Sequence, residues 1–196
     1  MALLFPNMKK AVLITILEWT LRINVFLKLT IYGVGKIIGG QFYLKGNIPE
    51  EIASIPLGDT GSYNLAWTFF GHSQAYILFI GISQLIGAFL LLFNRTKLVG
   101  GAILIPILMN IIVVDYLFGV AYGAMFSACF YLASILFVFY LHRERVIGAM
   151  KKLLVFSERK SDKKKRLLQA LIVVVALVAV FFVEWFFIDL FGYEDR

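Results

Sequence analysis

Long stretches of apolar residues divide the chain into five segments. They cover residues 11–40, 74–93, 98–119, 123–141 and 167–191. Each is close to or above the length of about 20 apolar residues that an α-helix needs to cross the hydrocarbon core of a bilayer. The pattern therefore predicts five transmembrane helices. The first segment carries charged residues, so we expect its section within the hydrocarbon to be shorter than its limits.

The composition agrees with this pattern. The chain has 196 residues, of which 61% are hydrophobic and 16% are charged, whereas soluble domains are about 45–50% apolar and about 25% charged. These values exclude a soluble globular protein and a disordered chain. Cys129 is the only cysteine, and His72 and His142 are the only histidines. The chain therefore predicts no internal disulfide and no metal site of its own, and its predicted fold class is an all-α, polytopic membrane protein.

The charged residues predict the orientation in the membrane. The formal net charge is +7, and residues 142–166, with ten Lys and Arg against three acidic residues, account for all of it. Basic residues concentrate in the cytoplasmic loops of membrane proteins. Lys9 and Lys10, Arg95 and Lys97, and the 142–166 segment all fall on one side of a five-span topology. We therefore expect a plasma-membrane (inner-membrane) protein whose N-terminus is cytoplasmic and whose C-terminus is outside.

The basic segment also predicts a partner. Its densest part immediately precedes the fifth span and consists of Lys163, Lys164, Lys165 and Arg166. A basic cluster beside the cytoplasmic end of a span is typical of contact with anionic lipid headgroups, so we expect lipid rather than nucleic acid. The segment separates the last span from the others, which predicts three parts: a four-helix bundle over residues 1–141, a cytoplasmic linker over 142–166, and a fifth helix with a short external tail over 167–196.

The external loop of residues 41–73 is long for a connection without structure of its own. It is rich in aromatic residues, namely Phe42, Tyr43, Tyr63, Trp67, Phe69 and Phe70. The sequence Pro49-Glu50-Glu51 is typical of a helix start, because Pro fits the first turn and acids favour the positive end of the helix dipole. We expect a short interfacial helix here. Two interpretations stay open: an aromatic belt at the headgroup level, or a lid over a cavity.

Ionisable residues inside a span are costly and usually functional, and they concentrate in the first span. At 100° per residue, Glu18 and Lys36 share one helix face, and Arg22 lies within about 60° of it. Lys28 points elsewhere, about 80° away. Glu18 and Arg22 are four residues apart, so they can form an ion pair along the helix. One interpretation is that this pair neutralises itself and has no further role.

Counting about 1.5 Å per residue from the start of each span places Arg22, Gln84 and Asn110 near the bilayer midplane. Asp115 lies nearer the outer surface, at a level that Lys36 and His72 can reach. The sequence therefore predicts two polar layers. Their members are Glu18, Arg22, Gln84 and Asn110 in the middle, and Lys36, His72 and Asp115 on the outer side. Such layers can bind a polar headgroup or a quinone carbonyl, or they can be ordinary hydrogen bonds between helices.

Several short stretches resemble one family. They are YGVGKIIGGQF (residues 32–42), WTFFGHS (67–73) and the sequence from residue 79 to residue 111. In this order they resemble DoxX-like membrane proteins over residues 15–141. The resemblance implies a four-helix membrane bundle, followed here by an additional transmembrane helix. It also implies a link to quinone-coupled sulfur oxidation or a role as a partner or assembly factor of redox enzymes. Related sequences often have Glu where this chain has Gln84.

Three functions follow from these observations. The first is a non-catalytic accessory or assembly subunit, because the chain has no nucleophile–base set or nucleotide loop and carries a further span; its partners would be other membrane subunits. The second is a quinone-linked membrane oxidoreductase of the sulfur-oxidation type, or its membrane subunit. In that case Arg22, Gln84 and Asn110 would hold the ring oxygens, and Lys36 and Asp115 would serve an outer access site or an anionic substrate. The third is a small transporter.

Overall fold

The computed structural model of the chain describes residues 5–154 and 163–191. Every regular element in these residues is helical, which confirms the predicted all-α class. The chain divides into two compact units, Met1–Met150 and Lys151–Arg196. The three-part division that we derived from the sequence, with borders at residues 141 and 166, stays a prediction.

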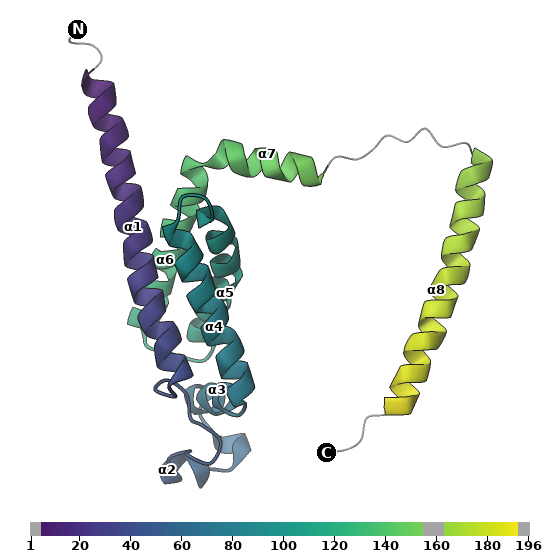
Figure 1. Ribbon diagram of the computed structural model, residues 1–196. Coiled ribbons are helices and arrows are strands. Elements are labelled where there is room, and N and C mark those ends of the chain that lie inside the picture. The colour runs from purple at the N-terminus through teal and green to yellow at the C-terminus, as the bar shows by residue number, and fades with distance from the viewer. Residues whose placement is uncertain (1–4, 155–162, 192–196) are drawn as a thin grey trace. The chain divides into compact units, whose positions relative to one another are not determined.

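Four long helices form a bundle in the first unit (Figure 1). They are α1 (Phe5–Ile37), α4 (Gln74–Leu92), α5 (Lys97–Leu117) and α6 (Tyr122–Leu141). Between α1 and α4 lie α2 (Glu50–Ala53), the 3₁₀ turn η1 (Leu57–Asp59) and α3 (Ser62–Gly71). The helix α7 (Arg143–Leu153) follows α6 directly, and α8 (Lys163–Phe191) belongs to the second unit.

Four helices are long and apolar enough to cross a membrane: α4, α5, α6 and the part of α8 from Leu167 to Phe187. The chain is therefore a multi-pass membrane protein, as its composition predicts. Helix α1 is not among these four, because Glu18, Arg22 and Lys28 interrupt its apolar sequence. The fourth helix of the bundle is therefore α1, whose buried charged side chains Glu18, Arg22 and Lys36 need partners within the bundle.

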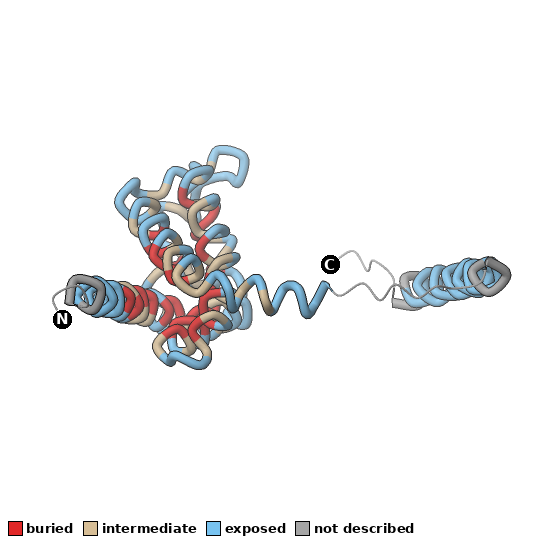
Figure 2. Tube along the Cα trace, turned by 90° about the horizontal axis from the view of Figure 1, so that it is seen from above, coloured by how far each residue is buried: buried red, intermediate tan, exposed pale blue. Residues whose placement is uncertain are grey.

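The bundle is a ring in which α1 contacts α4 and α6, and α5 contacts the same two helices. Short turns join α4, α5 and α6, so consecutive helices run in opposite directions. Buried residues line the inner faces of these helices, and their outer faces are exposed (Figure 2). Exposed apolar faces around a buried interior are expected for a bundle whose solvent is lipid.

Helix α1 is much longer than its neighbours. Its 33 residues extend for about 50 Å at 1.5 Å per residue, whereas the 19 residues of α4 extend for about 28 Å. Figure 1 shows the N-terminal part of α1 passing beyond the turn between α4 and α5. We call this end of the bundle the turn end and the opposite end, where α3 lies, the α3 end. The depth of a residue in the bundle therefore does not follow from its distance to the start of α1.

The structure adds detail to the predicted connections. The predicted helix start at Pro49 is confirmed, because Pro49 caps α2, and α2 has no buried residue. Helix α3 is an addition to the predicted elements, and its residues Tyr63, Ala66, Trp67 and Phe70 follow the spacing of one helix face. The segment 142–166, predicted as a linker, contains the amphipathic helix α7.

Close approach of the α4 and α5 backbones requires glycine at position 100. A Cβ atom on Gly100 would lie 2.5 Å from the backbone nitrogen of Leu91 and 2.6 Å from the carbonyl oxygen of Gly87. Both neighbours are backbone atoms, so they cannot move aside as a side chain can. Gly123 in α6 has no atom within 4 Å of the same position.

We therefore expect Gly100→Ala to destabilise the protein by about 3 kcal/mol, the upper end of the usual cost of overpacking. Gly123→Ala is the matched control and is expected to change stability by less than about 1 kcal/mol. Unfolding of both variants in mixed micelles, followed by circular dichroism, measures the difference. Equal stability of the two variants would contradict the helix contact described here.

Candidate functional site

Arg22 caps the C-terminal end of α4. Its Nε donates a hydrogen bond of 2.7 Å to the carbonyl oxygen of Leu91, and its Nη2 donates to the carbonyl oxygen of Leu92. Its Nη1 donates to Asn94 Oδ1 at 2.8 Å. The last carbonyls of a helix have no partner within the helix and carry partial negative charge. A guanidinium group satisfies them well, and Arg22 is only 1% exposed.

Glu18 is the anionic centre of the same cluster. Its Oε1 lies 3.2 Å from Arg22 Nη1 and 2.5 Å from Lys97 Nζ. Its Oε2 lies 3.2 Å from His142 Nε2, which is also 2.6 Å from Lys97 Nζ. The predicted Glu18–Arg22 pair is thus confirmed as part of a larger group. We call Glu18, Arg22, Asn94, Lys97 and His142 the cap cluster, and it ties α1 to α4, α5 and α6 at the turn end.

The predicted middle layer is wrong in its membership. Arg22 lies level with the last residues of α4, whereas Gln84 lies more than two turns away from that end. The first apolar residues of α1 lie beyond the end of α4, and the bundle begins near Glu18, so the distance from the start of the span does not give the depth of Arg22. Arg22, Gln84 and Asn110 therefore do not converge, and Glu18 and Arg22 have partners of their own.

A cavity of about 170 Å³ lies within the bundle toward its α3 end. All four bundle helices contribute to its wall, together with the segment after α1 and with α3. Its lining includes Leu29, Tyr32 and Lys36 from α1, Ile80 and Gln84 from α4, Leu108, Asn110, Ile111, Val114 and Asp115 from α5, Ala124, Ser127, Ala128 and Tyr131 from α6, and Gln41, Phe42, Trp67, Phe70 and Val120 from the connecting segments. An engineered apolar cavity of about 150 Å³ binds benzene, so this volume fits one six-membered ring.

The polar groups of the cavity come from both predicted layers. Lys36 Nζ donates to Gln84 Oε1 at 3.2 Å, and Gln84 Nε2 donates to the carbonyl oxygen of Leu29 at 2.9 Å. Asp115 and Asn110 line the same cavity. The predicted proximity of Lys36 and Asp115 is therefore confirmed, and Gln84 and Asn110 join this group rather than Arg22.

The Asp115 side chain stands out in this group. The residue is 8% exposed, yet within the described part of the chain its carboxylate makes no hydrogen bond and no ion pair within 4.0 Å. The carboxylate oxygens are not fully enclosed, so they face the cavity that Asp115 lines. The ammonium group of Lys36 has three N–H donors, and one of them donates a hydrogen bond to Gln84. The cavity thus offers unused donors from Lys36 and an unused acceptor on Asp115.

Aromatic residues cover the cavity at the α3 end. Phe42 is buried and meets Trp67 edge-on, with 5.7 Å between the ring centres, and it lies 5.4 Å from Phe70. Backbone hydrogen bonds from Tyr43 to Trp67 and from Lys45 to Gly71 hold this segment along α3. Of the two interpretations of the loop, the structure places aromatic rings over a cavity, and they belong to α3 and Phe42 rather than to α2.

Tyr63 stacks on Trp67, with 4.2 Å between the ring centres. Burial, and then the nearby Tyr43 phenol, raise the pKa of Tyr63 above its ordinary value. This aromatic cover therefore stays uncharged at neutral pH.

The mouth of the cavity is marked by its exposed lining residues. These are Tyr32 of α1, Asn110 of α5 and Ala124 of α6. Tyr32 and Asn110 lie on the two helices that flank α6, so the cavity opens around the N-terminal half of α6. In a bilayer this opening faces lipid.

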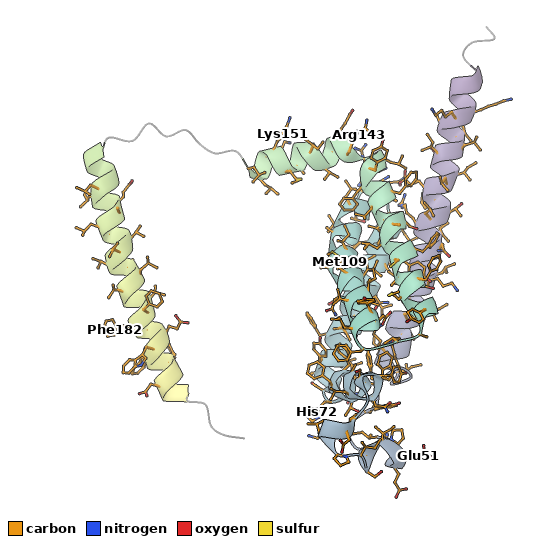
Figure 3. All side chains as sticks on the ribbon, turned by 180° about the vertical axis from the view of Figure 1, so that it is seen from behind. Glu51, His72, Met109, Arg143, Lys151 and Phe182 are labelled. Atoms are coloured by element: carbon orange, nitrogen blue, oxygen red, sulfur yellow. The ribbon has the colours of Figure 1, made fainter. Side chains whose placement is uncertain are left out.

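Two groups of predicted site residues lie elsewhere. His72 is exposed beyond α3 and does not line the cavity, so it is not part of the outer group (Figure 3). It follows α3 directly as that helix's C-cap. The side chains of Lys163, Lys164, Lys165 and Arg166 lie outside the described residues. Within the described part of the chain, no three His, Cys, Asp or Glu residues gather where a metal ion could bind.

Comparison with known proteins identifies a relative. The uncharacterized protein YwoB of Bacillus subtilis (strain 168) is 31% identical to this chain over 133 residues, which are 68% of this chain and 81% of YwoB. The chain belongs to the YwoB family. No protein-family model and no solved structure matches it, so the resemblance of this YwoB-family chain to DoxX-like proteins stays a prediction.

Sequence reasoning missed several residues of the site. Asn94, Lys97 and His142 complete the cap cluster, and Tyr131 faces the cavity. One signal was available: Asn94 and Lys97 flank the turn after α4, where a buried Arg on a neighbouring helix would meet free carbonyls. His142 offered no signal of this kind, because its position depends on how α6 packs against α1.

Removal of the Glu18 charge should destabilise the bundle. Glu18→Gln leaves the ammonium of Lys97 without its anion, and breaking a buried ion pair costs about 3 kcal/mol. Glu18→Gln combined with Lys97→Met removes both charges and is expected to cost less than the sum of the two single changes. Denaturation with sodium dodecyl sulfate in mixed micelles measures each variant.

The control is Glu144→Gln on the exposed side of α7, for which we expect a change within about 0.5 kcal/mol. A cost of Glu18→Gln no larger than that of Glu144→Gln would contradict the role of the cap cluster.

Proposed function

We propose that this protein binds the ring of a membrane quinone in its cavity. The observation that carries the proposal is the pairing of Lys36 and Asp115 in one ring-sized cavity, each with unused hydrogen-bonding capacity. A quinone carbonyl accepts a hydrogen bond from Lys36, and the hydroxyl of the reduced quinol can donate to Asp115. An isolated anion would be repelled by Asp115 and an isolated cation by Lys36, so a neutral ring suits the pair best.

The cover and the mouth of the cavity support the same ligand. Phe42, Trp67 and Phe70 form an apolar, aromatic wall against which a flat ring can stack. The exposed lining residues at the mouth of the cavity face lipid. An isoprenoid tail can therefore remain in the bilayer while the quinone ring enters the cavity. A volume of about 170 Å³ is too small to enclose a ligand with a long tail, because complete pockets for such ligands are usually about 300–1,000 Å³.

Orientation follows from charge. The turn end carries Arg95 and Lys97, and α7 carries further basic residues, whereas the α3 end carries Glu50, Glu51 and Asp59. By the positive-inside rule, the turn end is cytoplasmic and the cavity lies in the outer half of the membrane. The N-terminus is then cytoplasmic, and the membrane is the plasma membrane.

Helix α8 favours a second, compatible function, that of an accessory subunit. Its described residues from Leu167 to Phe187 are apolar apart from Gln169 and Glu184, and all are exposed. A helix with apolar residues on every side can anchor the chain in lipid or contact another membrane subunit. The two functions are compatible. An accessory subunit could bind quinone and pass it to a redox partner, which agrees with both functions predicted from the sequence.

The test is the quinone content of protein purified from its own membrane in mild detergent. We expect close to one quinone per chain in the wild type, measured by solvent extraction and redox difference spectroscopy. Lys36→Met keeps the length of the side chain but removes its charge. Because a hydrogen bond to a charged group contributes about 1.5–3 kcal/mol, quinone affinity should fall at least about tenfold.

Lys28→Met is the matched control, because Lys28 lies on the same helix but is exposed outside the cavity. It should retain the wild-type quinone content. A wild-type protein that holds no quinone and binds none on titration would refute the proposal, as would an equal effect of the two substitutions.

A further inference from the structure

Helix α7 begins where a membrane span ends. Helix α6 ends at Leu141 and α7 begins at Arg143, so only His142 separates them. The guanidinium of Arg143 lies 5.0 Å from the ring centre of Tyr140, which ties the first turn of α7 to the last turn of α6. The helix therefore starts at the level of the bilayer surface, on the side of the cap cluster.

The two sides of α7 differ sharply. At 100° per residue, its large apolar side chains fall within an arc of about 120°, which at the first turn of the helix also contains Arg143. They are Val146, Ile147, Met150 and Leu153, and the adjoining Leu154 continues the stripe. Ile147, Met150 and Leu153 are 48%, 52% and 86% exposed, and α7 has no buried residue. Within the first unit, the side chains of Ile147 and Met150 are therefore about half uncovered.

Basic side chains lie on one edge of the stripe and on the opposite side of the helix. Lys151 lies about 40° beyond Ile147, and Arg145 and Lys152 lie about 80–100° beyond Leu153, on the side away from the stripe, by the same angular count. Figure 3 shows Arg143 and Lys151 projecting from this helix. A polar hollow of about 280 Å³ lies at the junction with α6. Its lining is Leu141, His142, Arg143, Glu144 and Arg145.

We propose that α7 lies in the plane of the membrane interface and binds anionic phospholipid. Its apolar stripe enters the boundary between headgroups and acyl chains, and Arg145, Lys151 and Lys152 bind lipid phosphates. The charge pattern decides between occupants, because an apolar stripe on a helix whose polar side is rich in Lys and Arg matches an anionic lipid surface. A protein partner would have to supply acidic groups beside an apolar groove, and the adjoining membrane already provides both features.

Site-directed spin labelling of the full chain tests this proposal. Cys129 is the only cysteine, so Cys129→Ala gives a background for single cysteines. Ile147→Cys and Met150→Cys report on the apolar stripe, and Glu144→Cys and Gly148→Cys report on the opposite face. The labelled proteins are reconstituted into vesicles of phosphatidylcholine alone, or of phosphatidylcholine and phosphatidylglycerol in equal amounts. Collision of each label with oxygen and with a water-soluble nickel complex measures its immersion.

In the mixed vesicles we expect labels at 147 and 150 to be shielded from nickel and accessible to oxygen, and labels at 144 and 148 to show the reverse. The contrast should be several-fold smaller in phosphatidylcholine alone, and also when Arg145, Lys151 and Lys152 are all replaced by Gln. Similar nickel accessibility at all four positions would overturn the interfacial position of α7. Immersion that does not depend on phosphatidylglycerol or on the three basic residues would overturn the assignment to anionic lipid.

Discussion

The fold depends on one constraint: the buried guanidinium of Arg22 must have partners inside a membrane bundle. It finds them at the end of α4, where the carbonyls of Leu91 and Leu92 have no partner in their own helix. Glu18 supplies the counter-charge and also faces Lys97 and His142. Burying these charges costs desolvation free energy, which is offset only because each charge has a partner of opposite charge or a hydrogen-bond acceptor. The cap cluster therefore sets both the position of α1 along α4 and the end of the bundle.

This position determines what lies at the other end. Lys36 follows Arg22 by fourteen residues on the same helix face, about 21 Å along the axis. With Arg22 fixed at the end of α4, Lys36 reaches Gln84, and Gln84 in turn reaches the carbonyl of Leu29. The cavity thus receives its positive charge from α1 and its negative charge from Asp115 of α5. Helix α1 carries too many charges to match a simple apolar span. These charges make the interior of the bundle suitable for a polar ring.

The sequence predicts the helices better than their relative depth. Hydrophobic runs predict α4, α5 and α6 within a few residues, and angular spacing correctly places Glu18, Arg22 and Lys36 on one buried face. The predicted layer of Arg22, Gln84 and Asn110 is wrong, because a single sequence does not reveal how far α1 extends beyond α4. One of the two interpretations of the loop is a lid over a cavity, but the sequence pattern does not predict α3, the helix that carries the aromatic cover. His142 joins the cap cluster through tertiary packing alone.

The most direct test of this account is disulfide crosslinking between α1 and α4 in native membranes, in the Cys129→Ala background. Gly33 and Gly81 face each other closely: a Cβ atom on either would lie within 3.3 Å of the carbonyl oxygen of the other. The account predicts rapid oxidation of the pair Gly33→Cys and Gly81→Cys. It also predicts little oxidation of Gly33→Cys with Gly87→Cys, which is six residues and about 9 Å farther along α4. Preferential crosslinking of the second pair, or none of the first in folded protein, would contradict the position of α1 on which the cavity depends.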